Sequence, residues 1–374
     1  MLAVCSAHNG TIDLRQVDIP KVGPNDILVK VEAAAQNPTD WKFTSQGGFP
    51  KFIMGDSFNL SDLTIVGCDY AGVVTEVGES VTTDVKVGDR IVGWVFGSIE
   101  MNGAFAEYLV APSHMFLKPP QSWSFEDGSQ LAVACYTACQ CLYQSLGLPP
   151  PENPTTTPID ILVWGGSSSV GHFVIQLAKL GGMRVIATAS PKHFDRLKAL
   201  GANEVFDYHD PEVPQKIRAY TNENLQYAID CISEKSTYQL VSNSLSPEGG
   251  TISCILKYRT EVRPEVKVVF SIAYELFGKT FGSFTSSHEM IDLAKNSSDL
   301  ISKLLAEGKI TPAPLKIYPN GLASVSEGLE YMRSGKVSGE KIVYQDHYMN
   351  VQLRIQIMRL QSDRKEQLFV TRVM

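Results

Sequence analysis

The sequence predicts an α/β protein in which an antiparallel β-rich region is followed by a doubly wound parallel sheet. Up to about residue 120, short strands with alternating apolar residues are separated by glycine-containing turns, which favours an antiparallel barrel or sandwich. From about residue 159 onward, apolar strands alternate with helices, which is typical of a parallel sheet covered by helices. The length of 374 residues agrees with this division, because domains average roughly 150 residues.

Composition and charge narrow the class of protein further. Hydrophobic residues make up 44% of the chain and charged residues 20%, which argues against a disordered or fibrous protein. The net charge of −7 argues against a nucleic-acid-binding protein. No stretch approaches the roughly 20 apolar residues of a membrane span, and the first residues do not resemble a signal peptide. The seven cysteines show no regular pairing, which is typical of reduced thiols. We therefore expect a cytoplasmic enzyme with no nucleic-acid or membrane partner.

The β-rich region is expected to contain short strands and to end in a helix. The expected strands are residues 27–31, 71–77 and 90–95, with a turn at 87–89. Residues 125–146 have a helical pattern. The segment that follows, 148–158, is rich in proline and threonine and is expected to be a surface connection.

The second region begins with a strand at 159–164, a glycine- and serine-rich turn at 165–171 and a helix at 172–180. The next strand, 184–189, leads to a helix at 194–200 that Gly201 ends. Further strands are expected at 205–206, 227–231 and 251–256, and the last elements are helices at 289–308 and 325–334 and a strand at 341–344.

The turn at 165–171 is the strongest local signal for a cofactor. A buried strand enters it and a helix leaves it, with Gly165, Gly166 and Gly171 inside the turn. This arrangement lets the backbone approach a pyrophosphate, which then lies at the positive end of the helix. The spacing departs from the strict G-x-G-x-x-G pattern, and a serine-rich loop that only caps the helix is the alternative.

The end of the second strand indicates which cofactor is bound. An NAD site carries an acid there to bind the ribose hydroxyls. This chain has Ser190, Lys192 and His193 instead, and no carboxylate before Asp195. A hydroxyl and a cation suit a 2′-phosphate, so the sequence predicts NADPH. A solvated surface lysine at position 192 is the alternative.

Several motifs, in this order along the chain, resemble the medium-chain dehydrogenase/reductase superfamily. They are residues 37–42 (NPTDWK), 66–78 (VGCDYAGVVTEVG), 87–93 (VGDRIVG) and 103–108 (GAFAEY), together with the glycine turn. The resemblance covers residues 1 to about 345. It implies a GroES-like β-barrel catalytic domain that is interrupted in sequence by a Rossmann domain. The implied division is 1–155 for the first part of the catalytic domain, 156–280 for the Rossmann NADPH-binding domain, 281–345 for the segment that completes the catalytic domain, and 346–374 for a loosely ordered extension.

The zinc-dependent members of this superfamily have metal ligands that this chain lacks. Asn37 and Cys68 stand where those members carry a cysteine and a histidine, and a catalytic zinc needs three well-placed ligands. The cysteines of a structural zinc lobe are missing as well. We expect no metal. Cys135, Cys139 and Cys141 lie in a helical stretch and are expected to be core residues, and His114, His172 and His209 have no partners at ligand spacing.

Because it lacks the zinc ligands, the chain resembles the quinone oxidoreductase and enoyl reductase branch of this superfamily. The segments 190–195, 204–208, 227–232 and 338–344 are most similar to the trans-acting enoyl reductases of fungal polyketide biosynthesis. This resemblance implies NADPH-dependent hydride transfer to the β-carbon of an enoyl thioester, followed by protonation of the α-carbon. The acyl thioester would be bound to the carrier protein of a polyketide synthase. The cofactor supplies the hydride chemistry, while the protein orients the alkene and stabilises the enolate.

The resemblance also implies which residues form the site. Those implied to bind the cofactor are Thr39, Asp40, Trp41 and Lys42 beside the nicotinamide, Ser167, Ser168, Ser169 and Val170 at the pyrophosphate, Ser190, Pro191, Lys192 and His193 at the 2′-phosphate, and also Tyr208, Ile255, Leu256, Ser338 and Gly339. Those implied to line the acyl cleft are Ala138, Cys139, Gln140, Cys141, Leu142, Tyr143, Gln144 and Ser145, with Gly278, Lys279, Thr280 and Phe281.

Lys42 is the candidate catalytic residue. An ammonium near the thioester carbonyl would stabilise the negative charge that develops there. A lysine that only contacts the cofactor is the alternative, and both remain open. Tyr70 follows the glycine of the barrel motif at 66–78 and is expected to be a core residue.

Two segments depart from the branch, and two other functions remain open. Residues 44–64 are longer than usual and are expected to border the substrate cleft, and residues 346–374 have no counterpart in the family. That extension is either a loosely ordered tail or an amphipathic helix that binds a partner.

A free-standing NADPH:quinone or alkenal reductase shares every motif above, and a non-catalytic NADPH-binding structural protein is the third possibility. The chain is expected to be a monomer or a homodimer.

Overall fold

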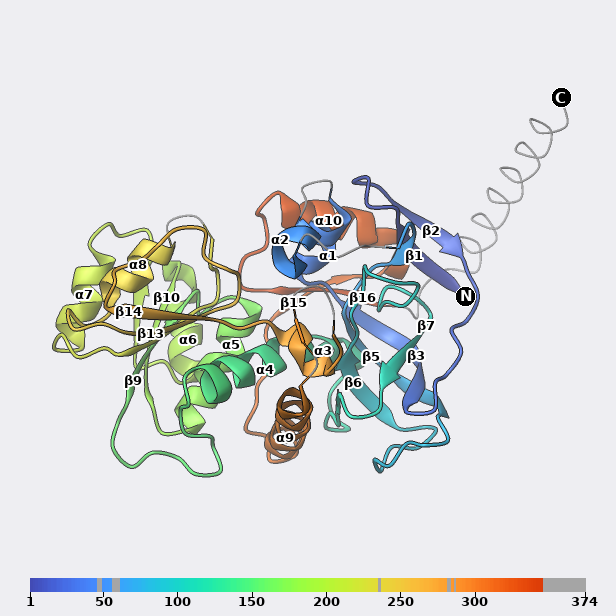
Figure 1. The fold of residues 1–374 in the computed structure, drawn as a ribbon, viewed down its shortest axis with the longest axis horizontal. Helices are drawn as coiled ribbons and strands as arrows, with labels where there is room; N and C mark the ends of the chain where they lie inside the picture. The colour runs from blue at the N-terminus through green and yellow to red at the C-terminus, as the bar shows by residue number, and fades with distance from the viewer. Residues whose placement is uncertain (46–48, 56–60, 235–236, 281–283, 286, 346–374) are drawn as a thin grey trace, which may run out of the picture.

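The computed structural model describes residues 1–45, 49–55, 61–234, 237–280, 284–285 and 287–345. The chain forms two lobes, a parallel sheet with its helices at the left of Figure 1 and mainly antiparallel sheets at the right. Phe281, residues 346–374 and parts of the 44–64 segment lie outside the described residues, so the expectations for them stay predictions. Within the described ranges, no helix combines the length and apolar character that crossing a membrane requires.

The left-hand lobe is built on a six-stranded parallel sheet with the strand order β11-β10-β9-β12-β13-β14. This is the strand order of a Rossmann sheet. Successive strands are added on one side of the first strand and, from the fourth strand onward, on its other side, and a dinucleotide binds at this switch point. The reversal lies between β9 and β12. The strands are β9 (Asp160–Trp164), β10 (Arg184–Ala189), β11 (Glu204–Asp207), β12 (Tyr227–Asp230), β13 (Gly250–Cys254) and β14 (Val266–Phe270).

Helices connect these strands, as the sequence predicts. They are α5 (Ser169–Leu180), α6 (Phe194–Leu200), α7 (Val213–Tyr220) and α8 (Thr237–Ser244), with a short 3₁₀ turn at Pro191–His193 before α6. Gly201 follows α6 with a φ of +122°, a conformation that favours glycine at a helix end. The predicted strand–helix alternation of this region is therefore confirmed.

The right-hand lobe contains a seven-stranded sheet and a three-stranded sheet. The larger has the order β15-β16-β3-β5-β6-β8, with β7 also paired to β3, and the smaller has the order β2-β1-β4. The strands are β1 (Leu2–Ser6), β2 (Ile12–Gln16), β3 (Asp26–Ala35), β4 (Thr64–Ile65), β5 (Asp69–Val77), β6 (Arg90–Trp94), β7 (Tyr108–Pro112), β8 (Phe116–Leu117), β15 (Leu315–Tyr318) and β16 (Lys341–Gln345). The mixed α/β fold with a GroES-like antiparallel part and a Rossmann sheet agrees with the predicted fold class.

The last strands of the chain belong to the right-hand lobe, together with the first strands. β15 and β16 follow the Rossmann strands in sequence, yet β16 pairs antiparallel to β3, with Val343 opposite Ala35. This pairing places the 338–344 motif beside the beginning of α1 (Pro38–Thr44). The end of the chain thus joins a sheet that the beginning of the chain forms, as the predicted order of domains requires. The boundaries of these domains stay a prediction.

The region expected to be one helix, 125–146, is three consecutive pieces. α3 (Phe125–Ser129) and α4 (Ala132–Cys139) are followed by a π-helical turn at Gln140–Ser145. The break lies at Gln130, whose buried amide bonds both backbone groups of Ala313, at 2.8 and 3.2 Å. This long-range anchor fixes the chain between the two helices. The remaining helices are α2 (Phe49–Met54), α9 (His288–Ala306) and α10 (Val325–Arg333), with 3₁₀ turns at Ala273–Phe277 and Gly321–Ser324.

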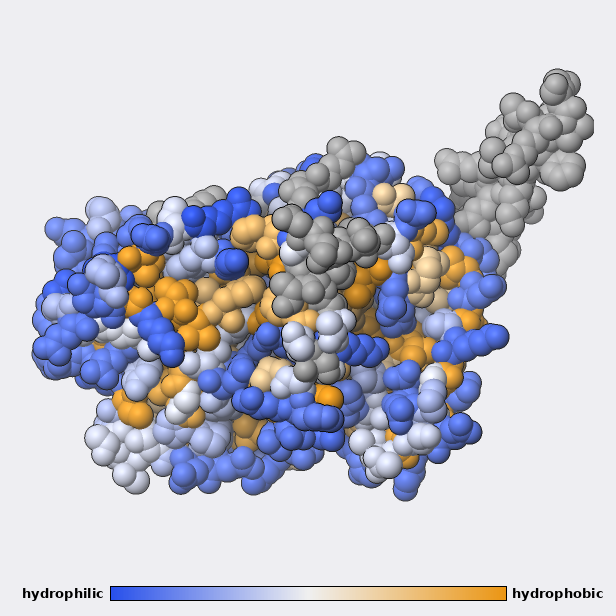
Figure 2. All heavy atoms as spheres, viewed as in Figure 1, coloured by the Kyte–Doolittle hydropathy of each residue, from blue (hydrophilic) through white to orange (hydrophobic). Residues whose placement is uncertain are grey.

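The main hydrophobic core extends from α4 and α5 to α9 and joins the two lobes. Cys135, Cys139 and Cys141 are fully buried in it, and Tyr70 is buried in the barrel core, so these core predictions are confirmed. On the face drawn in Figure 2, apolar side chains lie in separate patches on both lobes.

Candidate active site

The glycine turn forms a tight corner between β9 and α5. Gly165 has a φ of +78°, and a Cβ atom there would lie 2.6 Å from Cγ1 of Ile232. A Cβ atom on Gly171 would lie 2.4 Å from the carbonyl oxygen of Gly165. Ser168 caps the helix, because its Oγ accepts a hydrogen bond from the Gly171 amide at 3.1 Å. The corner requires glycine at both positions and directs the start of α5, with residues 167–170 half-buried, to the carboxyl edge of the sheet, which fits a pyrophosphate.

The residues predicted to bind a 2′-phosphate follow β10 at the same edge. Ser190 Oγ donates a hydrogen bond to the hydroxyl of Tyr208 at 3.3 Å. His193 Nε2 lies 3.1 Å from Ser338 Oγ, so a residue of the returning segment meets the Rossmann lobe here. Lys192 is exposed. The structure thus brings four predicted cofactor residues together in two pairs, and their role in binding stays a prediction.

Ile255 and Leu256 lie just beyond β13, also at the carboxyl edge. Both are half-buried, and the Ile255 amide donates to Ser233 Oγ at 3.1 Å. Ser233 is held in turn by Asp230, the last residue of β12. These contacts place the ends of β12 and β13 side by side, next to the reversal point of the sheet.

The helix α1 carries Lys42 to this edge from the other lobe. Lys42 Nζ forms an ion pair with a carboxylate oxygen of Glu234, in the loop that follows β12. The Lys42 side chain is 12% exposed and that of Glu234 is 45% exposed. Lys42 Nζ also lies 5.7 Å from the ring centre of Trp41. The ammonium group therefore stands where the two lobes meet. The sequence analysis did not identify Glu234, which is far from Lys42 in the chain and has no motif of its own.

A buried polar cluster fixes the beginning of α1. Lys341 Nζ donates to Asn37 Oδ1 at 2.7 Å and to Asp69 Oδ2 at 3.1 Å. Asp69 also accepts hydrogen bonds from Asn37 Nδ2 and from the amide of Val133, each at 2.8 Å. The cluster joins α1, β5, β16 and the first turn of α4, so it holds together four segments that are distant in sequence.

Asp40 adds a second carboxyl group to this cluster. Its Oδ2 accepts a hydrogen bond from the Asn37 amide at 2.6 Å. Burial raises the pKa of Asp40 to about 7, although the Asn37 amide and the nearby Lys341 act in the opposite direction. One ammonium group balances only one of the two buried carboxylates. Asp40 is therefore placed to hold a proton near neutral pH.

Tyr274 lies beside Thr39 and was not identified from the sequence. Its hydroxyl hydrogen-bonds to Thr39 and lies 3.8 Å from Cys68 Sγ. Its ring stacks on that of Phe96, with the ring centres 3.9 Å apart. Burial raises the pKa of Tyr274 well above its usual range, so the hydroxyl remains protonated and can donate. The only sequence signal was its place before the predicted acyl-binding segment.

The predicted acyl-binding segment is mostly buried. Ala138, Cys139, Gln140, Cys141 and Leu142 are buried, while Tyr143 and Ser145 are half-buried and Gln144 is exposed. This segment contacts the 3₁₀ turn at Ala273–Phe277, which directly precedes Gly278, because Gln140 Nε2 donates to a Glu275 carboxylate oxygen at 3.2 Å. Gly278 is half-buried, with a φ of +62°, and Lys279 and Thr280 are exposed. The first segment therefore lies beside the turn that leads into the second, and the contact of both segments with substrate stays a prediction.

Among the residues that the structure describes, no three histidine, cysteine or acidic side chains are grouped so that they could hold a metal ion. Asn37 and Cys68 have other partners, Asp69 and Tyr274. Cys68 is fully buried, and burial raises the pKa of its thiol well above the usual value, which opposes the thiolate that a metal needs.

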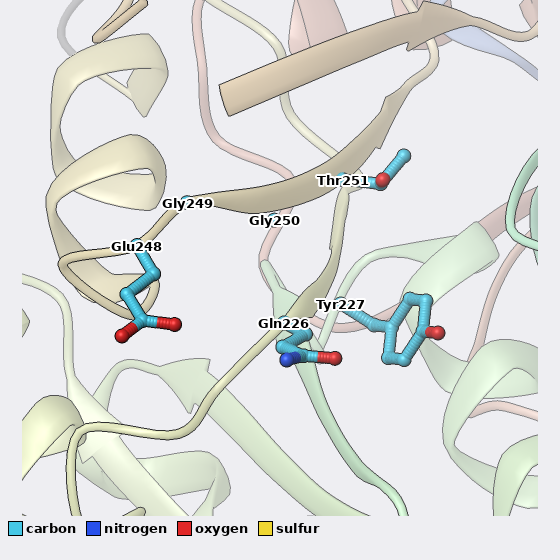
Figure 3. Close-up of a pocket in the computed structure, with 6 residues that line it drawn as sticks. All are labelled: Gln226, Tyr227, Glu248, Gly249, Gly250 and Thr251. Carbon is cyan, nitrogen blue, oxygen red and sulfur yellow. The ribbon is translucent and has the colours of Figure 1, made fainter. Parts of the chain in front are cut away.

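A separate pocket lies at the opposite edge of the Rossmann sheet. It is lined by the amino ends of β12 and β13, including Gln226, Tyr227 and Glu248 (Figure 3). Ligands of open parallel sheets bind at the carboxyl ends of the strands. This pocket is therefore distinct from the candidate site.

Comparisons with known proteins agree with this architecture. Residues 23–121 match the family described as alcohol dehydrogenase GroES-like domain, and residues 169–296 match the family described as zinc-binding dehydrogenase. The chain is 36% identical over 346 residues to a trans-enoyl reductase of Alternaria alternata, covering 91% of this chain and 98% of that protein. It is 32% identical over 354 residues to a trans-enoyl reductase of Petromyces alliaceus, covering 91% and 96%.

Solved structures share the fold at lower sequence identity. The CurK enoyl reductase has a TM-score of 0.74 and 19% identity, over 92% of this chain and 98% of that one. The quinone oxidoreductase of Coxiella burnetii has a TM-score of 0.68 and 24% identity, over 92% and 99%. These likenesses support the fold of the quinone oxidoreductase and enoyl reductase branch, which implies a nicotinamide cofactor.

Proposed function

The chain belongs to the trans-enoyl reductase family of the medium-chain dehydrogenase/reductase superfamily and is an oxidoreductase, and on this basis we propose that it catalyses NADPH-dependent reduction of an α,β-unsaturated thioester. In such a reaction a hydride is added to the β-carbon and a proton to the α-carbon. The nicotinamide cofactor supplies the hydride when it is bound. The protein has to orient the alkene and stabilise the negative charge on the thioester oxygen.

The observation that carries this proposal is the position of the Lys42 ammonium group. It extends from α1 to the loop after β12, at the carboxyl edge where a Rossmann sheet binds its dinucleotide. In a partly buried site, an ammonium group directed at the thioester oxygen stabilises the enolate more strongly than it would in water. Lys42 is thus the residue assigned to charge stabilisation. The proton donor at the α-carbon is left unassigned.

The preference for NADPH over NADH is part of the proposal. Ser190, Lys192 and His193 offer a hydroxyl, a cation and an imidazole after β10, and no carboxylate stands between Ala189 and Asp195 in the sequence. A charge-assisted hydrogen bond contributes about 1.5–3 kcal/mol, which is roughly a ten- to hundredfold difference in affinity. Lys192→Ala should reduce the preference mainly by weakening NADPH binding, and added salt should reduce it as well. Titration of both dinucleotides into the wild type and the variant tests this. Equal wild-type affinities would contradict it.

We also propose that the substrate is presented by the carrier domain of a separate polyketide synthase, as the trans-acting relatives imply. The test compares three acceptors with NADPH: an enoyl thioester of N-acetylcysteamine, the same acyl chain on a carrier protein, and a quinone. We expect reduction of both thioesters, with the larger kcat/KM for the carrier-bound chain. Faster reduction of the quinone would favour a free-standing quinone reductase. Binding of NADPH without reduction of any acceptor would favour a non-catalytic role.

A further inference from the structure

Arg196 in α6 is a partly buried guanidinium group that lacks an anionic partner among the described residues. Its Nη2 atom is buried and makes no hydrogen bond. Its Nη1 atom has one neutral neighbour, His172 Nδ1, at 3.4 Å. Burial lowers the pKa of Arg196, and no described carboxylate opposes this effect. A cation removed from water is costly unless an anion pairs with it, so the protein alone leaves the site incomplete.

His172 orients the guanidinium group but cannot neutralise it. His172 Nε2 lies 2.8 Å from the carbonyl oxygen of Thr311, so this nitrogen carries the proton and donates. The other ring nitrogen, Nδ1, then has a lone pair that accepts from Arg196 Nη1. Burial lowers the pKa of His172 to about 4, which keeps the ring neutral near pH 7. Arg196 is therefore held in one position with its second amino group unused.

The unused amino group lies among the residues predicted to bind the cofactor. A Cβ atom on Gly339 would lie 2.8 Å from Arg196 Nη2 and 2.6 Å from His193 Cε1. Gly339 has a φ of +67°, and a side chain at this position would collide with the guanidinium group. His193 also contacts Ser338. The guanidinium group thus extends from α6 to His172 of α5 and to Gly339 of the returning segment, beside the residues predicted to bind the 2′-phosphate.

We propose that Arg196 is a phosphate ligand of the dinucleotide, to which Nη2 donates a charge-assisted hydrogen bond. The inference rests on the proposed function only insofar as the chain binds a nicotinamide dinucleotide. A phosphate oxygen supplies the anion that the protein lacks, and Arg is well suited to bind one. The phosphate is either the pyrophosphate, which NADPH and NADH share, or the 2′-phosphate, which only NADPH carries. Binding of NADH therefore distinguishes the two.

The test is direct binding of NADPH and of NADH to the full chain, by calorimetric or fluorescence titration, with Arg196→Met. Arg218→Met is the control, because Arg218 lies on α7, away from this edge, and forms an ion pair with Glu223. We expect Arg196→Met to weaken NADPH binding by about tenfold or more, while Arg218→Met leaves it unchanged. Weakening of NADPH alone assigns the 2′-phosphate. Equal weakening of both dinucleotides assigns the pyrophosphate.

Further readouts separate binding from folding and from the proposed function. Thermal unfolding without dinucleotide should show that Arg196→Met is as stable as the wild type or more stable, since an unpaired cation is removed. Arg196→Lys keeps the charge and should restore part of the affinity, and it replaces the methionine variant if that one fails to fold. Wild-type affinity in the folded variants would overturn the inference alone. A wild-type chain that binds neither dinucleotide would overturn the proposed function as well.

Discussion

Two lysine–carboxylate pairs that involve or adjoin α1 differ sharply in their surroundings. The side chains of Lys341 and Asp69 are 3% and 0% exposed. Those of Lys42 and Glu234 are 12% and 45% exposed. The first pair lies within one lobe and has further hydrogen bonds to Asn37 and Val133. The second pair connects the two lobes.

This difference indicates different roles. A buried pair cannot change partner without leaving a charge unpaired, so this pair, with its hydrogen bonds to Asn37, fixes the position of α1. A pair whose carboxylate is in water contributes little to stability. The ammonium group of Lys42 can therefore be shared between Glu234 and a negative charge on a substrate at low cost. The buried lysine is structural, and the partly exposed lysine remains available for chemistry.

The largest effect on stability is expected from the buried pair. Lys341→Met leaves Asp69 charged and without its ammonium partner, and should lower the free energy of unfolding by about 3–5 kcal/mol. Lys216→Met, in an exposed pair with Asp210, is the control and should leave the free energy of unfolding almost unchanged. Chemical denaturation measures both. Equal losses would show that burial does not distinguish the pairs.

The next effect concerns the pH dependence of stability. Burial raises the pKa of Asp40 from 3.8 to about 7, so the folded chain keeps this proton over a pH range in which the unfolded chain has lost it. The corresponding stabilisation is complete below pH 3.8 and is lost as the pH rises to about 7. Its size is at most about 4 kcal/mol, because one pKa unit corresponds to about 1.4 kcal/mol.

Asp40→Asn should remove this component. The free energy of unfolding of the variant should fall less between pH 4 and pH 7 than that of the wild type. Denaturation curves at several pH values measure the difference. Parallel curves for the two proteins would mean that Asp40 is ionised in the folded chain throughout this range.

The smallest effect is expected at Glu234. Glu234→Gln removes an exposed carboxylate, so stability should change by less than about 1 kcal/mol. The amide that replaces the carboxylate carries no charge to hold the ammonium group in place. We therefore expect kcat with an enoyl thioester to fall by up to about tenfold, which corresponds to about 1.4 kcal/mol of activation free energy. Glu223→Gln, which affects the Arg218 pair on α7, should leave kcat unchanged. An unaltered or increased kcat for Glu234→Gln would show that the pair does not position Lys42.

Much of the fold could be predicted because its signals are local. The apolar run, the glycine turn and the following helix lie within residues 159–180, and all three form as expected. The break in the helix at 125–146 could not be predicted, because the anchor between Gln130 and Ala313 is a long-range contact. Local periodicity carries no information about such a partner.

The same reasoning explains what the sequence missed in the candidate site. Ser190, His193, Tyr208 and Ser338 were predicted by resemblance and lie together. Glu234 and Tyr274 act across the two lobes, and their positions follow only from the fold. Arg196 had a usable local signal, because it is three residues after His193, a spacing that places side chains on one face of a helix.

Lys42 is proposed to stabilise the charge that develops on an enoyl thioester during NADPH-dependent reduction. The most direct test is steady-state reduction of an enoyl thioester by the wild type and by Lys42→Met, combined with NADPH titration of both. We predict that kcat falls by about a hundredfold, as for removal of one group that stabilises an oxyanion, while NADPH affinity changes by less than about threefold, which is below 1 kcal/mol. An unchanged kcat, or a loss confined to NADPH affinity, would contradict the claim and reduce Lys42 to a cofactor contact.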